Sequence, residues 1–279
     1  MTNADPSDLV IRDIDNISEM REVERLQSEV WGVADLEVFP ALALIPIIEL
    51  GGVLVGAFDK DRMAGFVFGF PGQEKGKTIL HSDMLAVRPE YRRHGLGYTL
   101  KLAQRGRALA KGINTITWTF DPLQARNARL NFGKLGVISD SYRVNYYGET
   151  TSFLHRSGTD RLWVTWELDS ERVARRIEGN DLENSETSEP DVALRVDENR
   201  EPNICDIELK GKTSLAIEIP EDINELTGRD VEITSRWRAA TREVFTKLMD
   251  AGFRVTEFQF VTDARGRAGR YLLIKESAN

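Results

Sequence analysis

The residues best suited to chemistry lie in one short segment, Arg92–Gly97, which reads RRHGLG. An extended pattern ends just before it at Pro89, and a helical pattern follows from about Gly95 to Lys111. The first turn of a helix leaves backbone N–H groups without partners inside the helix, and these groups attract anions. Glycines let a phosphate approach the backbone closely, and the arginines add positive charge. The segment therefore predicts a binding site for a diphosphate.

The spacing of the glycines argues against two common nucleotide sites. A dinucleotide-binding fold requires G-x-G-x-x-G, and Leu100 stands where the third glycine would be. A P-loop requires G-x-x-x-x-G-K-[ST], which the segment does not contain. What remains is R-x-x-G-x-G directly after a strand that ends in Val-x-Pro.

Other side chains with chemical potential lie nearby in the sequence. His81 and Asp83 alternate on the predicted strand Thr78–Val87, so we expect them to share a face. A histidine titrates near neutral pH and suits a general base. The three histidines are scattered along the chain, which gives no case for a metal site. The single cysteine, Cys205, cannot form an internal disulfide.

Composition narrows the class of protein. The chain has 279 residues, of which 41% are hydrophobic, enough to build a full core. Its net charge of -8 makes a general nucleic-acid binder a poor expectation, because such binding depends on basic patches. The N-terminus shows no signal-peptide pattern. The longest apolar run, Phe39–Leu50, is interrupted and too short for a bilayer, so we expect a cytoplasmic protein without membrane partners.

The predicted elements divide the chain into three parts: residues 1–170, a polar acidic linker over 171–210, and a C-terminal βαββ lobe over 211–279. In the first part, periodicity and turn residues predict alternating helices and strands. The helices are expected at Asn16–Trp31, Leu36–Leu50, Gly95–Lys111 and Arg126–Leu135. The strands are expected at Val10–Ile11, Val53–Phe58, Met63–Phe70, Thr78–Val87, Asn114–Phe120, Tyr142–Tyr147 and Leu162–Leu168.

This order of elements, with R-x-x-G-x-G at the start of a central helix, resembles the GNAT superfamily of CoA-dependent N-acyltransferases. The segment Asn127–Val137 resembles the next motif of that family, and the likeness covers about Val10–Leu168. It implies an α+β fold, with a mixed, mostly antiparallel sheet, two splayed parallel strands and flanking helices. The segments Tyr142–Gly148 and Trp237–Arg242 are similar to a large branch with an added C-terminal lobe. That branch includes D-amino-acid N-succinyltransferases.

The resemblance implies acetyl-CoA or succinyl-CoA as co-substrate and no metal. The pyrophosphate would lie on main-chain amides at the start of the helix, and the pantetheine arm between the splayed strands. Asn127 would touch that arm or, as an alternative, only cap its helix. The residues implied in acyl-CoA binding are Leu85, Ala86, Val87, Arg92, Arg93, His94, Gly95, Leu96, Gly97, Tyr98 and Asn127.

The resemblance leaves alternatives for the residues that act in catalysis and for those that bind the acceptor. In the family a tyrosine of the motif helix often protonates the leaving thiolate, and here Phe132 stands at that position. Tyr146 and Tyr147 are the alternatives for the acid, and His81 and Asp83 are the candidates for the acceptor side. Asp83 stands where the branch would have a second histidine. An acceptor with a carboxylate would favour an arginine, and the candidates are Arg161, Arg238 and Arg242.

Two interpretations of function remain open at this point. The first is an enzyme that transfers an acyl group to a small amine, most simply an amino acid, with an amine antibiotic or a protein N-terminus as other acceptors. The second is a non-catalytic sensor of acyl-CoA, suggested by Phe132. A homodimer is compatible with either interpretation.

Overall fold

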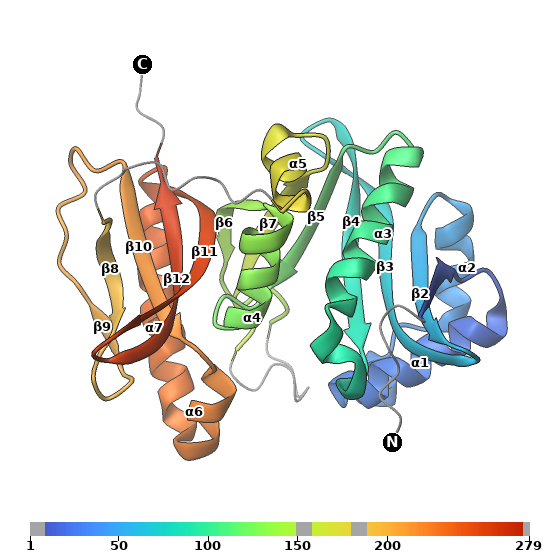
Figure 1. The fold of residues 1–279 in the computed structure, drawn as a ribbon, viewed down its shortest axis with the longest axis horizontal. Helices are drawn as coiled ribbons and strands as arrows, with labels where there is room; N and C mark the ends of the chain where they lie inside the picture. Colours follow the sequence, from blue (N-terminus) through green and yellow to red (C-terminus); the bar gives the residue numbers. More distant parts are fainter. Residues whose placement is uncertain (1–8, 149–157, 180–188, 276–279) are drawn as a thin grey trace. The chain divides into compact units, whose positions relative to one another are not determined.

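The computed structural model describes residues 9–148, 158–179 and 189–275 (Figure 1). These residues form two compact units, one reaching to Trp118 and the other beginning at Thr119. Each unit combines helices with β-strands, which gives the expected α+β class. Taken one at a time, none of the described helices is long and apolar enough to cross a membrane.

The first unit is a five-stranded sheet with helices against it. Its strand order is β1-β2-β3-β4-β5, antiparallel except for the last pair. The helices that pack on it are α1 and α2, which share an apolar core with the sheet, and α3, which contacts β2, β3 and β4. The bounds are Val10–Asp13 for β1, Ile17–Trp31 for α1, Ala41–Glu49 for α2, Val53–Asp59 for β2, Arg62–Glu74 for β3, Lys77–Val87 for β4, Leu96–Ala110 for α3 and Thr115–Phe120 for β5.

Local signals explain most boundaries in this unit. The side chain of Asn16 accepts a hydrogen bond from the Glu19 amide at 3.0 Å and so caps α1, as its sequence position predicts. The helix predicted over Leu36–Leu50 is shorter, since only a 3-10 turn (η2, Asp35–Glu37) precedes α2. The side chain of Gln27 bonds the amide and carbonyl of Phe39 and keeps that residue outside a helix.

The parallel strands β4 and β5 separate after a short contact. Leu80 pairs with Ile116 and His81 with Thr117, and among the described residues the pairing does not continue along β4 beyond His81. Ser82–Val87 therefore keep one edge of β4 without a β5 partner. A β-bulge also lies here, because Gly69 pairs with Ser82 and Phe68 with Met84, which leaves Asp83 as the extra residue. The predicted splay is thus present.

The second unit has the strand order β7-β6-β11-β12-β10-β8-β9. Its helical elements are α4 (Ala125–Ala128), η4 (Arg129–Leu135), α5 (Glu171–Ile177), α6 (Ile223–Arg229) and α7 (Val231–Asp250). Its strands are β6 (Ile138–Arg143), β7 (Arg161–Glu167), β8 (Asp191–Val196), β9 (Pro202–Ile204), β10 (Ser214–Pro220), β11 (Arg254–Asp263) and β12 (Gly266–Ile274).

The structure of this unit differs from three sequence predictions. The strand expected at Tyr142–Tyr147 is Ile138–Arg143, because Asn145 has a φ of 46° and the chain turns there. The linker expected at 171–210 contains α5, β8 and β9, and the apolar side chains of β8 are buried beside β10. The chain divides at Trp118 rather than at residue 170, because β6 pairs with β11 in one sheet.

Candidate functional site

The start of α3 has the backbone geometry that the RRHGLG segment predicts. Gly95 has a φ of 73°, in the left-handed region that favours glycine, and joins the turn η3 (Pro89–His94) to α3. The Tyr98 amide donates to the Gly95 carbonyl at 2.9 Å and is already used inside the helix. The amides of Leu96 and Gly97 precede it, in the positions where a helix leaves donors for an external acceptor. Of the amides predicted to hold a diphosphate, that of Tyr98 has an acceptor within the helix, and the role of the others stays a prediction.

Side chains fix this helix start against the end of β4. A Cβ added to Gly97 would lie 3.8 Å from Cδ2 of Leu85, which places α3 beside β4 at ordinary contact distance. Arg92 donates from Nε to the Val87 carbonyl at 3.0 Å, so its side chain folds back over the strand end. Of Arg93 and His94 the structure describes the backbone only, and their predicted role stays a prediction.

Arg88, which the sequence analysis did not identify, packs at the same end of β4. Its side chain is buried, donates from Nε to the Met63 carbonyl at 2.8 Å and from Nη2 to Glu22 at 2.8 Å, and also pairs with Glu29. The only sequence signal was its place before Pro89. Since its donors are engaged by protein groups, Arg88 positions the site and is not an anion ligand.

His81 lies at the last paired position of β4 and β5. Its Nδ1 is 3.0 Å from the Thr117 hydroxyl, and its ring lies 5.5 Å from the ring of Phe70. Burial, with the nearby charge of Lys101, lowers the pKa of His81 to about 4. The imidazole is therefore neutral at physiological pH and can accept a proton.

Asp83 does not share a simple strand face with His81. The alternation that predicted this is interrupted, because Asp83 is the extra residue of the β-bulge. Its side chain keeps solvent contact, yet enough protein surrounds it that desolvation raises the pKa of its carboxyl group. The bulge redirects this side chain, and sequence alternation gave no sign of that.

Phe132 and Asn127 occupy the motif helix of the second unit. Phe132 is fully buried, with its ring 6.1 Å from Phe120 and 5.8 Å from Tyr271, and it has no proton to donate. Asn127 is exposed on α4, and nothing in the structure tests its predicted contact with pantetheine. The helix continues as the π-helical segment η4.

Tyr146 and Tyr147 lie in the turn after β6, not on a strand. Their rings are perpendicular at 4.8 Å, and the Tyr147 hydroxyl is 3.2 Å from the Thr119 hydroxyl. Both residues are partly exposed, 41% for Tyr146 and 47% for Tyr147. Their predicted role as acid stays a prediction.

The structure separates the three predicted substrate arginines. Arg238 binds both oxygens of Asp121, at 2.8 and 3.0 Å, and Arg242 binds both oxygens of Asp160, at 2.9 and 2.8 Å. Each of these two arginines therefore faces its own carboxylate, and their predicted role in binding the acceptor stays a prediction. Arg161 is buried, and within the described part of the chain it donates to the backbone carbonyl of Asp160, at 2.8 Å. Among the described residues, no carboxylate forms an ion pair with it.

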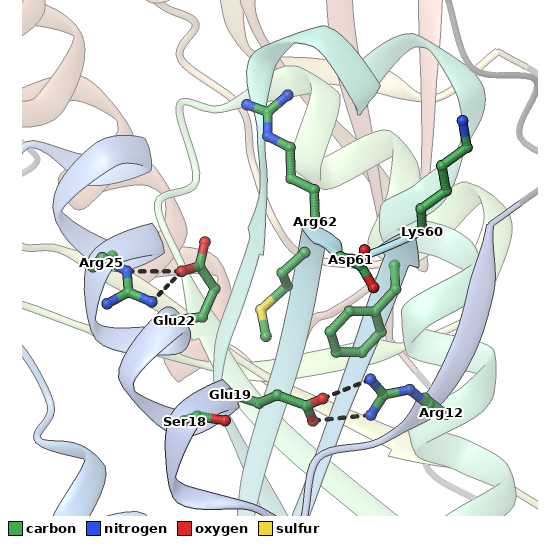
Figure 2. Close-up of a pocket in the computed structure, with 10 residues that line it drawn as sticks. Arg12, Ser18, Glu19, Glu22, Arg25, Lys60, Asp61 and Arg62 are labelled. Carbon is green, nitrogen blue, oxygen red and sulfur yellow. Dashed lines mark hydrogen bonds and ion pairs between the residues drawn. The ribbon is translucent and has the colours of Figure 1, made fainter.

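One open hollow of about 410 Å³ lies between α1 and the turn that joins β2 to β3. Figure 2 shows that charged side chains line it, with Arg12 bound to Glu19 of α1 and Arg25 bound to Glu22 on α1 itself. None of the residues predicted to bind acyl-CoA lines it. We interpret it as a solvated ion-pair surface. No group of three or more described His, Cys, Asp or Glu residues is placed to hold a metal ion.

Comparison with known proteins finds similar solved structures and one matching family model. Solved structures with similar folds include the ribosomal-protein-S18-alanine N-acetyltransferase of Escherichia coli, at 15% identity with a TM-score of 0.46 over 58% of this chain and 95% of that one. A GNAT-family acetyltransferase of Streptococcus pneumoniae matches at 15% identity and a TM-score of 0.46, over 56% of this chain and 98% of that one.

The yncA protein of Salmonella typhimurium, solved with its cofactor acetyl-CoA, matches at 14% identity and a TM-score of 0.47, over 58% and 95% of the two chains. No curated protein matches the sequence. Residues 18–136 match the family model described as the acetyltransferase (GNAT) family, and this chain therefore contains a GNAT acetyltransferase domain.

Proposed function

We propose that the protein transfers an acyl group, acetyl or succinyl, from acyl-CoA to the amino group of a small molecule by direct attack on the thioester. The observation that supports this most is the start of α3. Gly95 is in the left-handed conformation, the amides of Leu96 and Gly97 lead the helix, and the unpaired edge of β4 begins beside them. A diphosphate at the helix start and an extended arm along the strand edge together match the shape of CoA.

Gly97→Ala tests the diphosphate site with little risk to the fold. The new Cβ meets no protein atom closer than 3.8 Å, so alanine should raise helix stability slightly, by about 0.5–1 kcal/mol. The same Cβ occupies space that a phosphate needs, and we expect CoA affinity to fall about tenfold or more. Isothermal titration calorimetry with CoA measures this.

Gly106→Ala is the matched control for that variant. Gly106 is an exposed glycine of the same helix, and a Cβ placed on it would meet no heavy atom within 4 Å. We expect the same small gain in stability and unchanged CoA affinity. Equal CoA affinity in both variants would show that the diphosphate does not bind at the start of α3.

For the acceptor we propose an amino acid whose carboxylate binds Arg161. Arg238 and Arg242 each pair with a carboxylate, whereas Arg161 has one hydrogen-bond partner among the described residues, a backbone carbonyl, and lies 5.2 Å from the ring of Tyr147. A guanidinium with free donors suits a carboxylate. Thiol release with acetyl-CoA and succinyl-CoA, against a panel of L- and D-amino acids, identifies the acyl group and the acceptor.

Arg161→Gln should raise KM for the amino acid roughly 10- to 100-fold, since a charge-assisted hydrogen bond contributes about 1.5–3 kcal/mol. It should leave KM unchanged for the matching amino-acid amide, which has no carboxylate. A similar rise for both acceptors would show that Arg161 acts on the fold and not on the carboxylate.

A non-catalytic acyl-CoA sensor is the second candidate, and the burial of Phe132 favours it, because this residue leaves the motif helix without an acid. CoA binding without thiol release on any amine of the panel would support the sensor. Release with any one of them would exclude it.

A further inference from the structure

Lys101 on α3 has a buried side-chain amine next to the strand that splays. Its Nζ donates to the Ser82 hydroxyl at 2.8 Å and to Oε1 of Gln104 at 3.3 Å, and it lies 3.6 Å from the centre of the Trp118 ring. The residue is 2% exposed. Among the described residues, no carboxylate pairs with it. A buried lysine without a counter-ion is costly, so a role beyond packing is expected.

The position of this amine coincides with the point where β4 and β5 part. His81 and Thr117 form the last pair, and Ser82 and Trp118 are the next residues on the two strands. Lys101 therefore contacts both strands at the vertex of the opening. From Val87 back to Ser82 the strand covers roughly 16 Å at about 3.3 Å per residue. An extended pantetheine arm that starts at the α3 amides reaches this vertex with its thioester end.

We propose that Lys101, acting through the Ser82 hydroxyl, supplies the proton to the departing CoA thiolate. This rests on the proposed function. The acceptor nitrogen forms a bond to the thioester carbon, and the carbon–sulfur bond then breaks with its electron pair on sulfur. The Ser82 hydroxyl gives its proton to sulfur and takes one from the Lys101 ammonium, which becomes a neutral amine. A proton removed from the acceptor ammonium restores Lys101, directly or through solvent.

The groups around Lys101 are compatible with Lys101 as an acid and His81 as a base at this vertex. From β4 the titratable neighbour is His81, β5 presents the ring of Trp118, and α3 itself presents Gln104. The faces of β2 and β3 that pack on α3 are buried and apolar over Val53–Phe58 and Met63–Phe68. Burial lowers the pKa of Lys101 well below its usual value, so its ammonium gives up a proton more readily than that of an exposed lysine.

The first test needs CoA binding but no turnover. The thiolate absorbance of enzyme-bound CoA is titrated with pH in the wild type, in Lys101→Met and in the control Lys111→Met, an exposed lysine at the end of the same helix. An ammonium near the sulfur lowers the pKa of a thiol, so Lys101→Met should raise that pKa by about one unit or more. Lys111→Met should not change it. The same pKa in all three proteins would overturn the proposal.

The second test follows kcat with pH. In the wild type kcat should fall as pH rises through the pKa of Lys101, because the acid must be protonated. Lys101→Met should lower kcat roughly 100-fold and abolish that basic limb, and CoA affinity should stay within about threefold. Lys101→Arg keeps the charge but cannot give up a proton in this range, so kcat should stay low. A limb that persists in Lys101→Met, or full activity in Lys101→Arg, would refute proton delivery.

The outcomes separate this inference from the proposed function. If wild-type protein does not bind CoA, both fail. If CoA binds and its thiol titrates identically with and without Lys101, the inference alone fails. If the thiol pKa depends on Lys101 but no amine is acylated, the proposed transfer fails and the contact between Lys101 and sulfur is supported.

Discussion

Arg238→Met lowers the free energy of unfolding by about 3–5 kcal/mol, the range observed when one partner of a buried ion pair is removed. Arg238 is 5% exposed and binds Asp121 through two parallel hydrogen bonds, at 2.8 and 3.0 Å. Without the guanidinium the Asp121 carboxylate keeps the Leu123 amide, at 3.0 Å, and loses its counter-charge. Urea denaturation followed by far-UV circular dichroism measures the loss.

Two further variants make this result specific to the buried pair. Arg236→Met removes an arginine two residues earlier on α7, one whose partners Glu201 and Asp230 lie at the surface, and we expect little change in stability. The double variant Arg238→Met with Asp121→Asn removes both charges and should recover much of the loss. Equal destabilisation by Arg236→Met and Arg238→Met would contradict the interpretation.

This pair also shows what the sequence could not reveal. Arg238 and Arg242 lie four residues apart on a helix, which predicts a shared face, but helical spacing says nothing of what faces them. Their carboxylate partners, Asp121 and Asp160, are distant in sequence, and each pairs with only one of them. A pattern can place a charged residue on a helix, whereas its neutralisation depends on tertiary contacts.

Other features were predictable because their causes are local. The capped start of α1, the glycine at the start of α3 and the antiparallel strands β2, β3 and β4 follow from periodicity, caps and turn residues. The β-bulge at Asp83 was not predictable in the same way, because it changes the register of one strand pair without a turn signal.

Lys101 was missed for a related reason. Leu100 and the small residues of α3 indicate a buried face, and a lysine next to them is typical of the solvated edge of a helix. Yet Lys101 follows Gly97 by four residues and therefore lies on the side of α3 that faces β4. That spacing was the signal in the sequence. It identifies the side of α3 that faces β4 only once Gly97 is known to lie next to Leu85.

Two successive segments of the second unit have a similar order of helical elements and strands. A strand, a helical pair and an antiparallel hairpin follow one another as β10, α6–α7 and β11–β12, and a helical segment followed by the hairpin β6–β7 precedes them. The two hairpins pair through Ser139 and Val255. Within this unit, β6 and β11 are therefore the strands through which the two hairpins pair.

His81→Gln is expected to lower kcat about 10²-fold at neutral pH, the lower end of the usual contribution of a general base, because the lowered pKa makes the imidazole a weaker base. The neutral imidazole of His81 lies at the vertex of β4 and β5, where it can take the proton of an acceptor ammonium. Because burial and Lys101 lower the pKa of His81 to about 4, the base stays available well below the pH at which an ordinary histidine is protonated. The acid limb of kcat/KM should therefore lie near pH 4, and not near about 6.5.

The lowered pKa of His81 also changes the free energy of unfolding with pH. The effect of His81 on stability can therefore be measured separately from its effect on kcat. Between the folded pKa of about 4 and the unfolded value near 6.5, the unfolded chain binds more protons at His81, so wild-type stability decreases as pH falls through this window. His81→Gln removes this contribution and should flatten the dependence while the kcat loss persists at pH 7. Circular dichroism melts at pH 4.5, 5.5 and 7, beside initial rates at the same pH values, measure both. An acid limb near 6.5 in the wild type, or undiminished kcat in the variant, would exclude His81 as the base.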